Sequence, residues 1–241
     1  ETAAIPMPSE LRPYPRLEEI GVIGNCQFSA LVDHLGEVVW CCLPRFDSEP
    51  VFSTLLDAGG GGRFRIGPAD GQAGTQSYQQ STNILETTFQ TPTGVFRVID
   101  FAPRFLQYER AFRPTQMVRI VEPLEGSPRI AVVCEPKLGW SKRKPEAVAG
   151  SHHVRYEGFA SSLRLTTDIP LSYLGGQGFT LTERQHFILS WGAPVEEPLA
   201  SLCERFLNQT ARYWQNWVKH CNIPPLHQQE VIRSALALKL H

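Results

Sequence analysis

Residues 40–48 combine side chains that could bind a sugar. Their sequence is WCCLPRFDS, in which a proline ends an extended run and Arg45, Phe46 and Asp47 follow. A guanidinium and a carboxylate can hydrogen-bond sugar hydroxyls, and an aromatic ring can stack on a sugar face. The alternative is a structural ion pair between Arg45 and Asp47 that shapes the loop, and the local chemistry alone favours this alternative.

Other chemistries are poorly supported by the residue spacing. Four consecutive glycines, Gly59 to Gly62, lack the Gly-Lys-Ser/Thr sequence of a phosphate-binding loop, so they predict a turn before a strand at Arg63–Ile66. The seven histidines show no metal-ligand spacing, and no G-x-S-x-G elbow is present for a serine nucleophile. The sequence therefore implies no metal and no cofactor.

The six cysteines and the balanced charge narrow the class of protein further. No C-x-x-C pair is present, and the adjacent Cys41 and Cys42 would point to opposite faces of a strand. A zinc site is therefore disfavoured, and we expect reduced core thiols in a cytoplasmic protein. A formal net charge of −1 creates no field to recruit nucleic acid or an anionic membrane, and no apolar run is long enough to span a bilayer.

The elements that position these residues are predicted to be short strands. From residue 20 to residue 180, β-type runs alternate with turn signals. This pattern favours a large antiparallel β-sandwich, and the lack of βαβ alternation argues against a doubly wound fold. The strands expected are residues 27–32 and 37–43 around a turn at 33–36, residues 84–90 and 95–101 around a turn at 91–94, and Met117–Glu122, Arg129–Glu135, Ser162–Thr167 and Arg184–Trp191.

Two helices are predicted after Pro198. The first is an amphipathic segment that ends before Pro224 and Pro225. The second runs from His227 to the end and is apolar around most of its circumference, which is typical of a helix buried on several sides. Because this helix also lacks a stop signal, we expect it to be the first helix of a larger helical domain. The alternative is a terminal helix that packs on a sheet.

A series of motifs resembles bacterial glycoside hydrolase family 15, the glucoamylase and trehalase group. The motifs occur in the family's order along almost the whole chain, so chance agreement is a poor explanation. They are GVIGNC at residues 21–26, LPRFDS at 43–48, VFSTLLD at 51–57, TNILET at 82–87, VIDFAP at 98–103, FILSWG at 187–192, the aromatic residues Tyr213, Trp214 and Trp217, and RSALALKL at 233–240.

The chain also departs from the family pattern at three places. Asn25 stands where aspartate is usual, and residues 37–39 replace the usual Ser-Ile-Asp. Residues 137–144, with the sequence KLGWSKRK, occupy the region where many members have PRFDYGR. These departures leave open any family role for the loop at residues 139–143.

The resemblance implies an N-terminal β-sandwich followed by an (α/α)6 barrel. The implied organisation is an N-terminal arm at 1–17, a β-sandwich domain (supersandwich) at 18–193, a linker helix at 194–225 and the start of the missing helical catalytic domain at 226–241. Substrate-rim candidates are Arg45, Phe46 and Asp47. Candidates for the interface with the barrel are Trp214, Trp217, Arg233, Leu236 and Leu240.

Family members are inverting hydrolases of α-glucosidic bonds, and inversion needs two carboxyl groups about 6.5–9.5 Å apart. In the family both are glutamates of the barrel, so no catalytic residue is assigned within residues 1–241. The resemblance thus implies an accessory domain that packs on the barrel of the same protein, stabilises it and lines its active-site rim. The isolated chain is expected to be inactive.

The alternative is a free-standing carbohydrate-binding or structural module derived from such an enzyme. The gene beyond the codon for His241 distinguishes the two, since several hundred further codons support the enzyme and a stop codon supports the module. If the barrel is absent, the apolar last helix is expected to self-associate or to pack back on its own chain.

Overall fold

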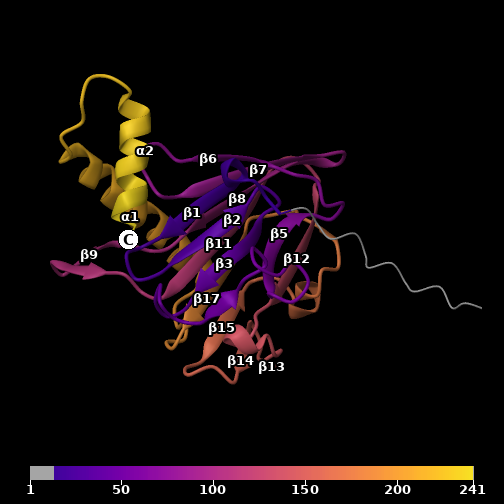
Figure 1. Ribbon diagram of the computed structural model, residues 1–241. Coiled ribbons are helices and arrows are strands. Elements are labelled where there is room, and N and C mark those ends of the chain that lie inside the picture. The colour runs from indigo at the N-terminus through magenta and orange to yellow at the C-terminus, as the bar shows by residue number, and fades with distance from the viewer. Residues whose placement is uncertain (1–13, 241) are drawn as a thin grey trace, which may run out of the picture.

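The computed structural model describes residues 14–240 as two antiparallel sheets followed by two helices (Figure 1). This arrangement confirms the predicted mainly β, sandwich class. Most of the N-terminal arm predicted at residues 1–17 lies outside the described residues, and its last residue begins a short 3-10 helix, Leu17–Glu19. None of the described helices is long and apolar enough to cross a membrane.

One sheet has the strand order β1-β2-β3-β5-β12-β16, with β4 paired to β3. Its turn between β2 and β3 is the one predicted at residues 33–36, where the Asp33 carboxylate accepts from the backbone N–H groups of Leu35 and Glu37. Gly36 has φ +74°, and a Cβ there would strike the carbonyl oxygen of Ile66. The strands are β1 (Ile20–Gly24), β2 (Ser29–Asp33), β3 (Glu37–Cys42), β4 (Pro50–Phe52), β5 (Arg63–Pro68), β12 (Arg129–Glu135) and β16 (Phe179–Thr180).

The other sheet has the order β13-β14-β15-β17-β11-β8-β7-β6. Its hairpin of β7 and β8 is the one predicted around residues 91–94. A separate short hairpin, β9 (Phe105–Gln107) with β10 (Arg110–Phe112), projects from the sandwich beside the helices (Figure 1). The strands are β6 (Thr75–Tyr78), β7 (Leu85–Thr91), β8 (Gly94–Phe101), β11 (Gln116–Gly126), β13 (Glu146–Ala149), β14 (His153–Glu157), β15 (Leu163–Thr167) and β17 (Gln185–Trp191).

The strands named individually from the sequence are all present within one or two residues at most ends, except that β11 extends to Gly126. The edge strands β6 and β13 of this sheet, and β14 next to β13, were not expected individually. Every residue of β13 is exposed, so this strand has no buried alternate positions from which it could be recognised. The strand forms by pairing with β14 in a hairpin, in which Ala149 lies opposite Val154 and Glu146 lies opposite Glu157.

Helix α1 (Leu199–Lys219) packs on the outer face of the second sheet. Leu202, Cys203 and Phe206 from the helix join the sheet residues Ile120 and Ile188 in one buried cluster. The second sheet is therefore covered on both faces, by the first sheet and by α1. This explains why the middle of β11 is buried at five successive positions, a pattern that one-sided burial would not give.

Helix α2 (Gln228–Lys239) returns against α1 and β1 (Figure 1). Leu236 and Leu240 are buried against Trp214, whereas Leu238 is 77% exposed. The helix thus buries one stripe within its own chain, and its opposite side is open. The expectation that it would pack back on its own chain agrees with this arrangement.

The thiols give a first testable expectation. Burial raises the pKa of Cys134 to about 12 and raises the pKa values of Cys41 and Cys203 as well. For Cys134 this higher pKa lowers the fraction of thiolate, which is the reactive form, by about a thousandfold. At pH 8 a maleimide should therefore modify the part-exposed Cys26 and Cys221 first, and mass spectrometry of peptides should show this order. Modification of Cys134 in the folded protein at a rate similar to Cys221 would contradict the buried core.

Candidate functional site

The loop at residues 43–48 leaves its charged side chains in solvent. Arg45 donates to the Asp47 carboxylate at 3.1 Å, and the Ser48 hydroxyl accepts from the Arg45 backbone N–H at 3.1 Å. The side chains of Arg45 and Asp47 are 66% and 70% exposed, so the pair adds little stability. Phe46 is 40% exposed. The loop thus contains the Arg45–Asp47 pair and also presents all three rim candidates at the surface.

A second surface segment flanks this loop. The ammonium of Lys142 donates to Asp57 at 2.6 Å, and this hydrogen bond lowers the pKa of the Asp57 carboxyl. Trp140, which is 58% exposed, lies 6.3 Å from Trp40 between ring centroids. The segment that departs from the family pattern at residues 137–144 thus packs beside the strands that carry the loop.

The five interface candidates lie in three different environments. Trp214, Leu236 and Leu240 are buried together between α1 and α2. Arg233 is held by the sandwich, since it donates to the Thr82 carbonyl and to the Asn83 side chain. Trp217 is part-exposed and borders an open pocket.

Asn83 completes the attachment of α2 to the sandwich. Its side-chain NH2 donates to the carbonyl of Leu236 at 3.0 Å. The Arg233 guanidinium also lies 3.9 Å from the ring centroid of Tyr78, and burial lowers the pKa of Arg233. The Tyr78 hydroxyl in turn bonds to both backbone groups of Val22 on β1. The TNILET motif therefore fixes the second helix, a role that the sequence did not reveal.

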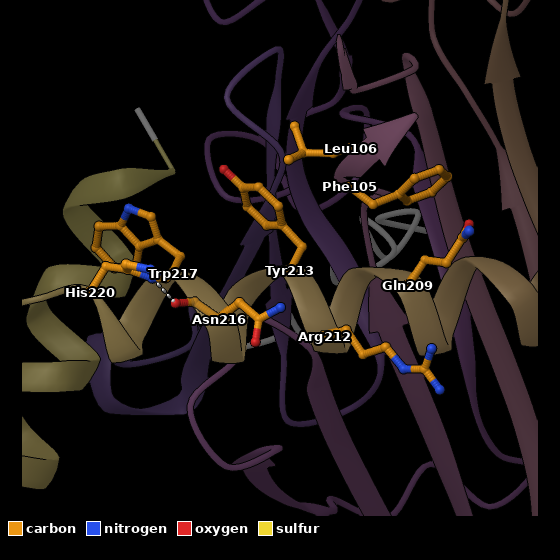
Figure 2. Close-up of a pocket in the computed structure, with 8 residues that line it drawn as sticks. All are labelled: Phe105, Leu106, Gln209, Arg212, Tyr213, Asn216, Trp217 and His220. Carbon is orange, nitrogen blue, oxygen red and sulfur yellow. Dashed lines mark hydrogen bonds between the residues drawn. The ribbon is translucent and has the colours of Figure 1, made fainter. Parts of the chain in front are cut away.

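The open pocket lies on α1 beside the β9–β10 hairpin and has a volume of about 360 Å³ (Figure 2). Leu106, which is 65% exposed, extends over it from the hairpin, and Tyr213 and Trp217 line it from the helix. Stacking of Phe105 on Phe112 anchors the hairpin against Phe206 of α1. The result is a mostly apolar surface supported by these three packed rings.

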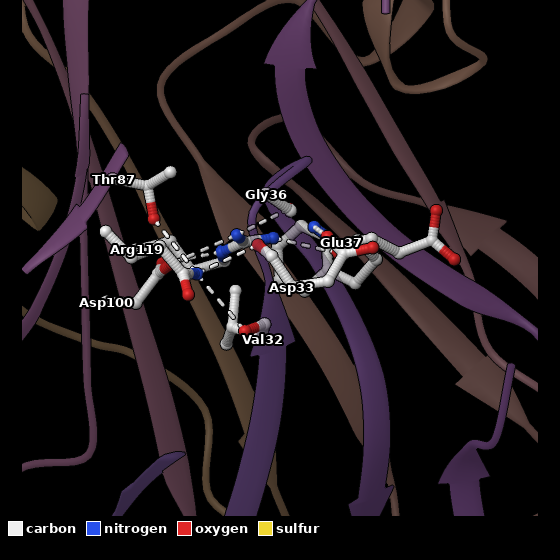
Figure 3. A network of polar contacts seen from close by, with 9 residues as sticks. Val32, Asp33, Gly36, Glu37, Thr87, Asp100 and Arg119 are labelled. Carbon is white, nitrogen blue, oxygen red and sulfur yellow. Dashed lines mark hydrogen bonds and ion pairs between the residues drawn. The ribbon is translucent and has the colours of Figure 1, made fainter. Parts of the chain in front are cut away.

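The carboxylates in motif positions each have a cationic partner. Asp47 pairs with Arg45, Glu86 pairs with Arg97 at 3.0 Å, and Asp100 pairs with Arg119 at 2.7 Å. Figure 3 shows the last pair within a network of polar contacts that includes Gly36. Both Asp100 and Arg119 are fully buried. These three carboxylates thus have structural partners.

Two further buried polar residues, Arg104 and Asn25, are hydrogen-bonded to each other, and Arg104, which the sequence did not single out, joins the sandwich to α1. Arg104 donates to the Tyr213 hydroxyl at 2.8 Å and to the Asn25 carbonyl at 2.6 Å. Asn25 is fully buried, and its NH2 group donates to the carbonyls of Pro103 and Pro114. An aspartate could not donate these two hydrogen bonds, so asparagine suits this position. The departure from the family pattern therefore has a structural reason.

Comparison with known proteins agrees with the motifs. A family model described as "Trehalase-like, N-terminal" matches residues 12–168. A trehalase of Thermoplasma volcanium is 28% identical over 240 residues, which cover 94% of this chain and 38% of that protein. A trehalase of Mycolicibacterium smegmatis is 29% identical over 272 residues, which cover 99% of this chain and 40% of that protein. Trehalase 1 of Sulfolobus acidocaldarius is 39% identical over 87 residues, which cover 36% of this chain and 15% of that protein.

The sandwich, the LPRFDS loop and these relatives define a glycoside hydrolase-related N-terminal β domain. The chain belongs to the trehalase-like N-terminal domain family. The resemblance to the glucoamylase and trehalase group is thereby confirmed. The chain spans about two fifths of the length of the first two relatives.

Proposed function

We propose that this chain is the accessory N-terminal domain of an inverting α-glucoside hydrolase of the trehalase type. Its role is to pack on a helical (α/α)6 catalytic domain, to stabilise it and to line its active-site rim with Arg45, Phe46 and Asp47. The observation that carries this proposal is the alignment with trehalases over 94% of the chain but 38% of the relative. The match to the Mycolicibacterium smegmatis trehalase covers 99% of the chain and so includes both helices, and it covers 40% of that protein, so the larger part of this relative lies outside the aligned part.

The helical end of the molecule supports a docking role. The pocket in Figure 2 is mostly apolar and lies on α1 between Leu106 and Trp217, and Leu238 is exposed on the outer side of α2. Apolar side chains gathered at one end favour a protein partner. The occupant proposed is the helical catalytic domain, and a second copy of the chain is the alternative occupant when that domain is absent.

The six free thiols support a location in the cytoplasm, where cysteines stay reduced. The exposed rim loop supports contact with an α-glucoside bound to the catalytic domain, because its guanidinium, ring and carboxylate lie at the surface. The domain divisions at residues 18–193, 194–225 and 226–241 remain predictions.

The chain alone should release no glucose from trehalose or maltotriose. The reason is that Asp47, Glu86 and Asp100 are held in ion pairs, whereas inverting hydrolysis needs a protonated acid and a free base. A coupled glucose assay on the purified chain and on the complete gene product should show activity in the second sample only. Glucose release by the chain alone, or a gene that ends at residue 241, would overturn the proposal.

A further inference from the structure

A groove of about 460 Å³ lies beside the rim loop, apart from the pocket on α1. It is bounded by Leu43–Glu49, by the 3-10 helix η2 (Gly139–Ser141), by the turn at residues 158–160 and by the end of β17. A volume of this size is in the range of small-molecule sites.

The groove has an aromatic wall and an apolar floor. Phe159 and Trp191 meet edge to face with ring centroids 5.6 Å apart, and both rings are partly exposed. Leu43 and Val51 are buried beneath them. Rigid aromatic rings of this kind offer apolar surface to the C–H face of a ring-shaped ligand.

The rim of the groove carries two opposite charges. Glu49 and Arg143 both line it, and within residues 14–240 neither side chain forms an ion pair. The Glu49 carboxylate lies directly against Gly139, where a Cβ would overlap it, so the glycine makes room for this carboxylate. A charged ligand would leave one of the two groups opposed by a like charge. A neutral polyol satisfies both, because each hydroxyl can donate to the carboxylate and accept from the guanidinium.

We infer that this groove is a non-catalytic binding site for an α-linked glucose disaccharide. Trp191 and Phe159 supply the stacking surface, and Glu49 and Arg143 bind the hydroxyls. The choice of glucose rests on the proposed function, whereas the preference for a neutral saccharide rests on the groove itself. Glu49 is the one carboxylate among the groove-lining residues, so the pair of carboxyl groups that inversion needs is absent from this lining.

Titration of the full chain with trehalose and with maltose, followed by amide NMR, tests the inference. Shifts should concentrate at residues 43–51, 138–143 and 158–160 and at Trp191. Glu49→Gln should weaken binding about tenfold, because it removes a charged hydrogen-bond acceptor and keeps the shape of the side chain. Glu125→Gln, at an exposed position on β11, is the matched control and should bind as the wild type does.

Arg143→Met should weaken binding by a similar factor, with the amide spectrum unchanged outside the groove. Cellobiose, the β-linked disaccharide, should bind less tightly. If no saccharide shifts the amide signals, or if the Glu49 and Glu125 substitutions have equal effects, the groove is not a saccharide site. If cellobiose binds more tightly, the assignment of an α-linked disaccharide as the ligand is wrong. None of these outcomes affects glucose release by the complete gene product, so the two proposals fail separately.

Discussion

Replacing Arg119 with methionine should lower the free energy of unfolding by about 3–5 kcal/mol. Arg119 is fully buried on β11 and donates to both oxygens of Asp100, at 2.7 and 3.1 Å. It also donates to the carbonyls of Phe64 and Gly36, which belong to the other sheet and its turn. One guanidinium therefore joins the two layers, and its removal leaves an unpaired buried carboxylate. Urea denaturation followed by tryptophan fluorescence measures the loss.

Two variants separate this role from a general effect of losing an arginine. Arg155→Met removes an ion pair with Glu157 whose side chains are 42% and 43% exposed, so it should cost less than about 1 kcal/mol. The double variant Arg119→Met with Asp100→Leu should be more stable than Arg119→Met alone, since it leaves no buried charge unpaired. Equal losses for Arg119→Met and Arg155→Met would contradict the role of the buried pair.

Arg119 also shows where sequence reasoning reaches its limit. The strand around it was predicted, because Met117 to Val121 is a β-type run, but nothing local tells which face an arginine in such a run occupies. Its partner Asp100 is 19 residues earlier, and its other acceptors are in the opposite sheet. The buried position of Arg119 is explained only once the first sheet is packed on this face, because that sheet and its turn supply the carbonyls of Phe64 and Gly36.

The rim loop and the last helix show the same limit in different ways. The local sequence was sufficient to predict the loop after Pro44 and to favour the pairing of Arg45 with Asp47 as the alternative to sugar binding, because both features depend on neighbouring residues. The apolar composition of the last helix predicted burial, but Arg233 and Asn83 determine what it packs against. These contacts join residues about 150 positions apart. Neither helical periodicity nor composition contains that information.

The groove at Glu49 and Arg143 was missed for a related reason. Its lining comes from four separate stretches of the chain, and the strongest signal, an aromatic pair of Phe159 and Trp191, spans two of them. Gly139 was noted as part of a loop that departs from the family pattern, but the sequence cannot show that its missing Cβ accommodates a carboxylate. Sites assembled from distant loops require the fold before they can be recognised.

Replacing Trp214 with alanine should cost about 3–5 kcal/mol and should loosen α2 in particular. Trp214 is fully buried, and Leu236 and Leu240 pack on it, so its removal opens a cavity between the two helices. Hydrogen exchange should then become faster at the amides of residues 228–239 than in β8 and β11, because the main apolar contact of the helix is lost and chiefly the polar contacts of Arg233, Asn83 and Cys26 remain.

Trp214→Phe should cost much less, since phenylalanine keeps most of the apolar contact and also removes the indole N–H, which has no hydrogen-bond partner among the described residues. Trp217→Ala removes a part-exposed ring from the same helix and should leave the amides of α2 protected. If Trp214→Ala and Trp217→Ala change the exchange of α2 equally, the buried tryptophan is not what holds the last helix. If they differ as expected, Trp214, and not the part-exposed Trp217, is the α1 side chain that holds α2 in place.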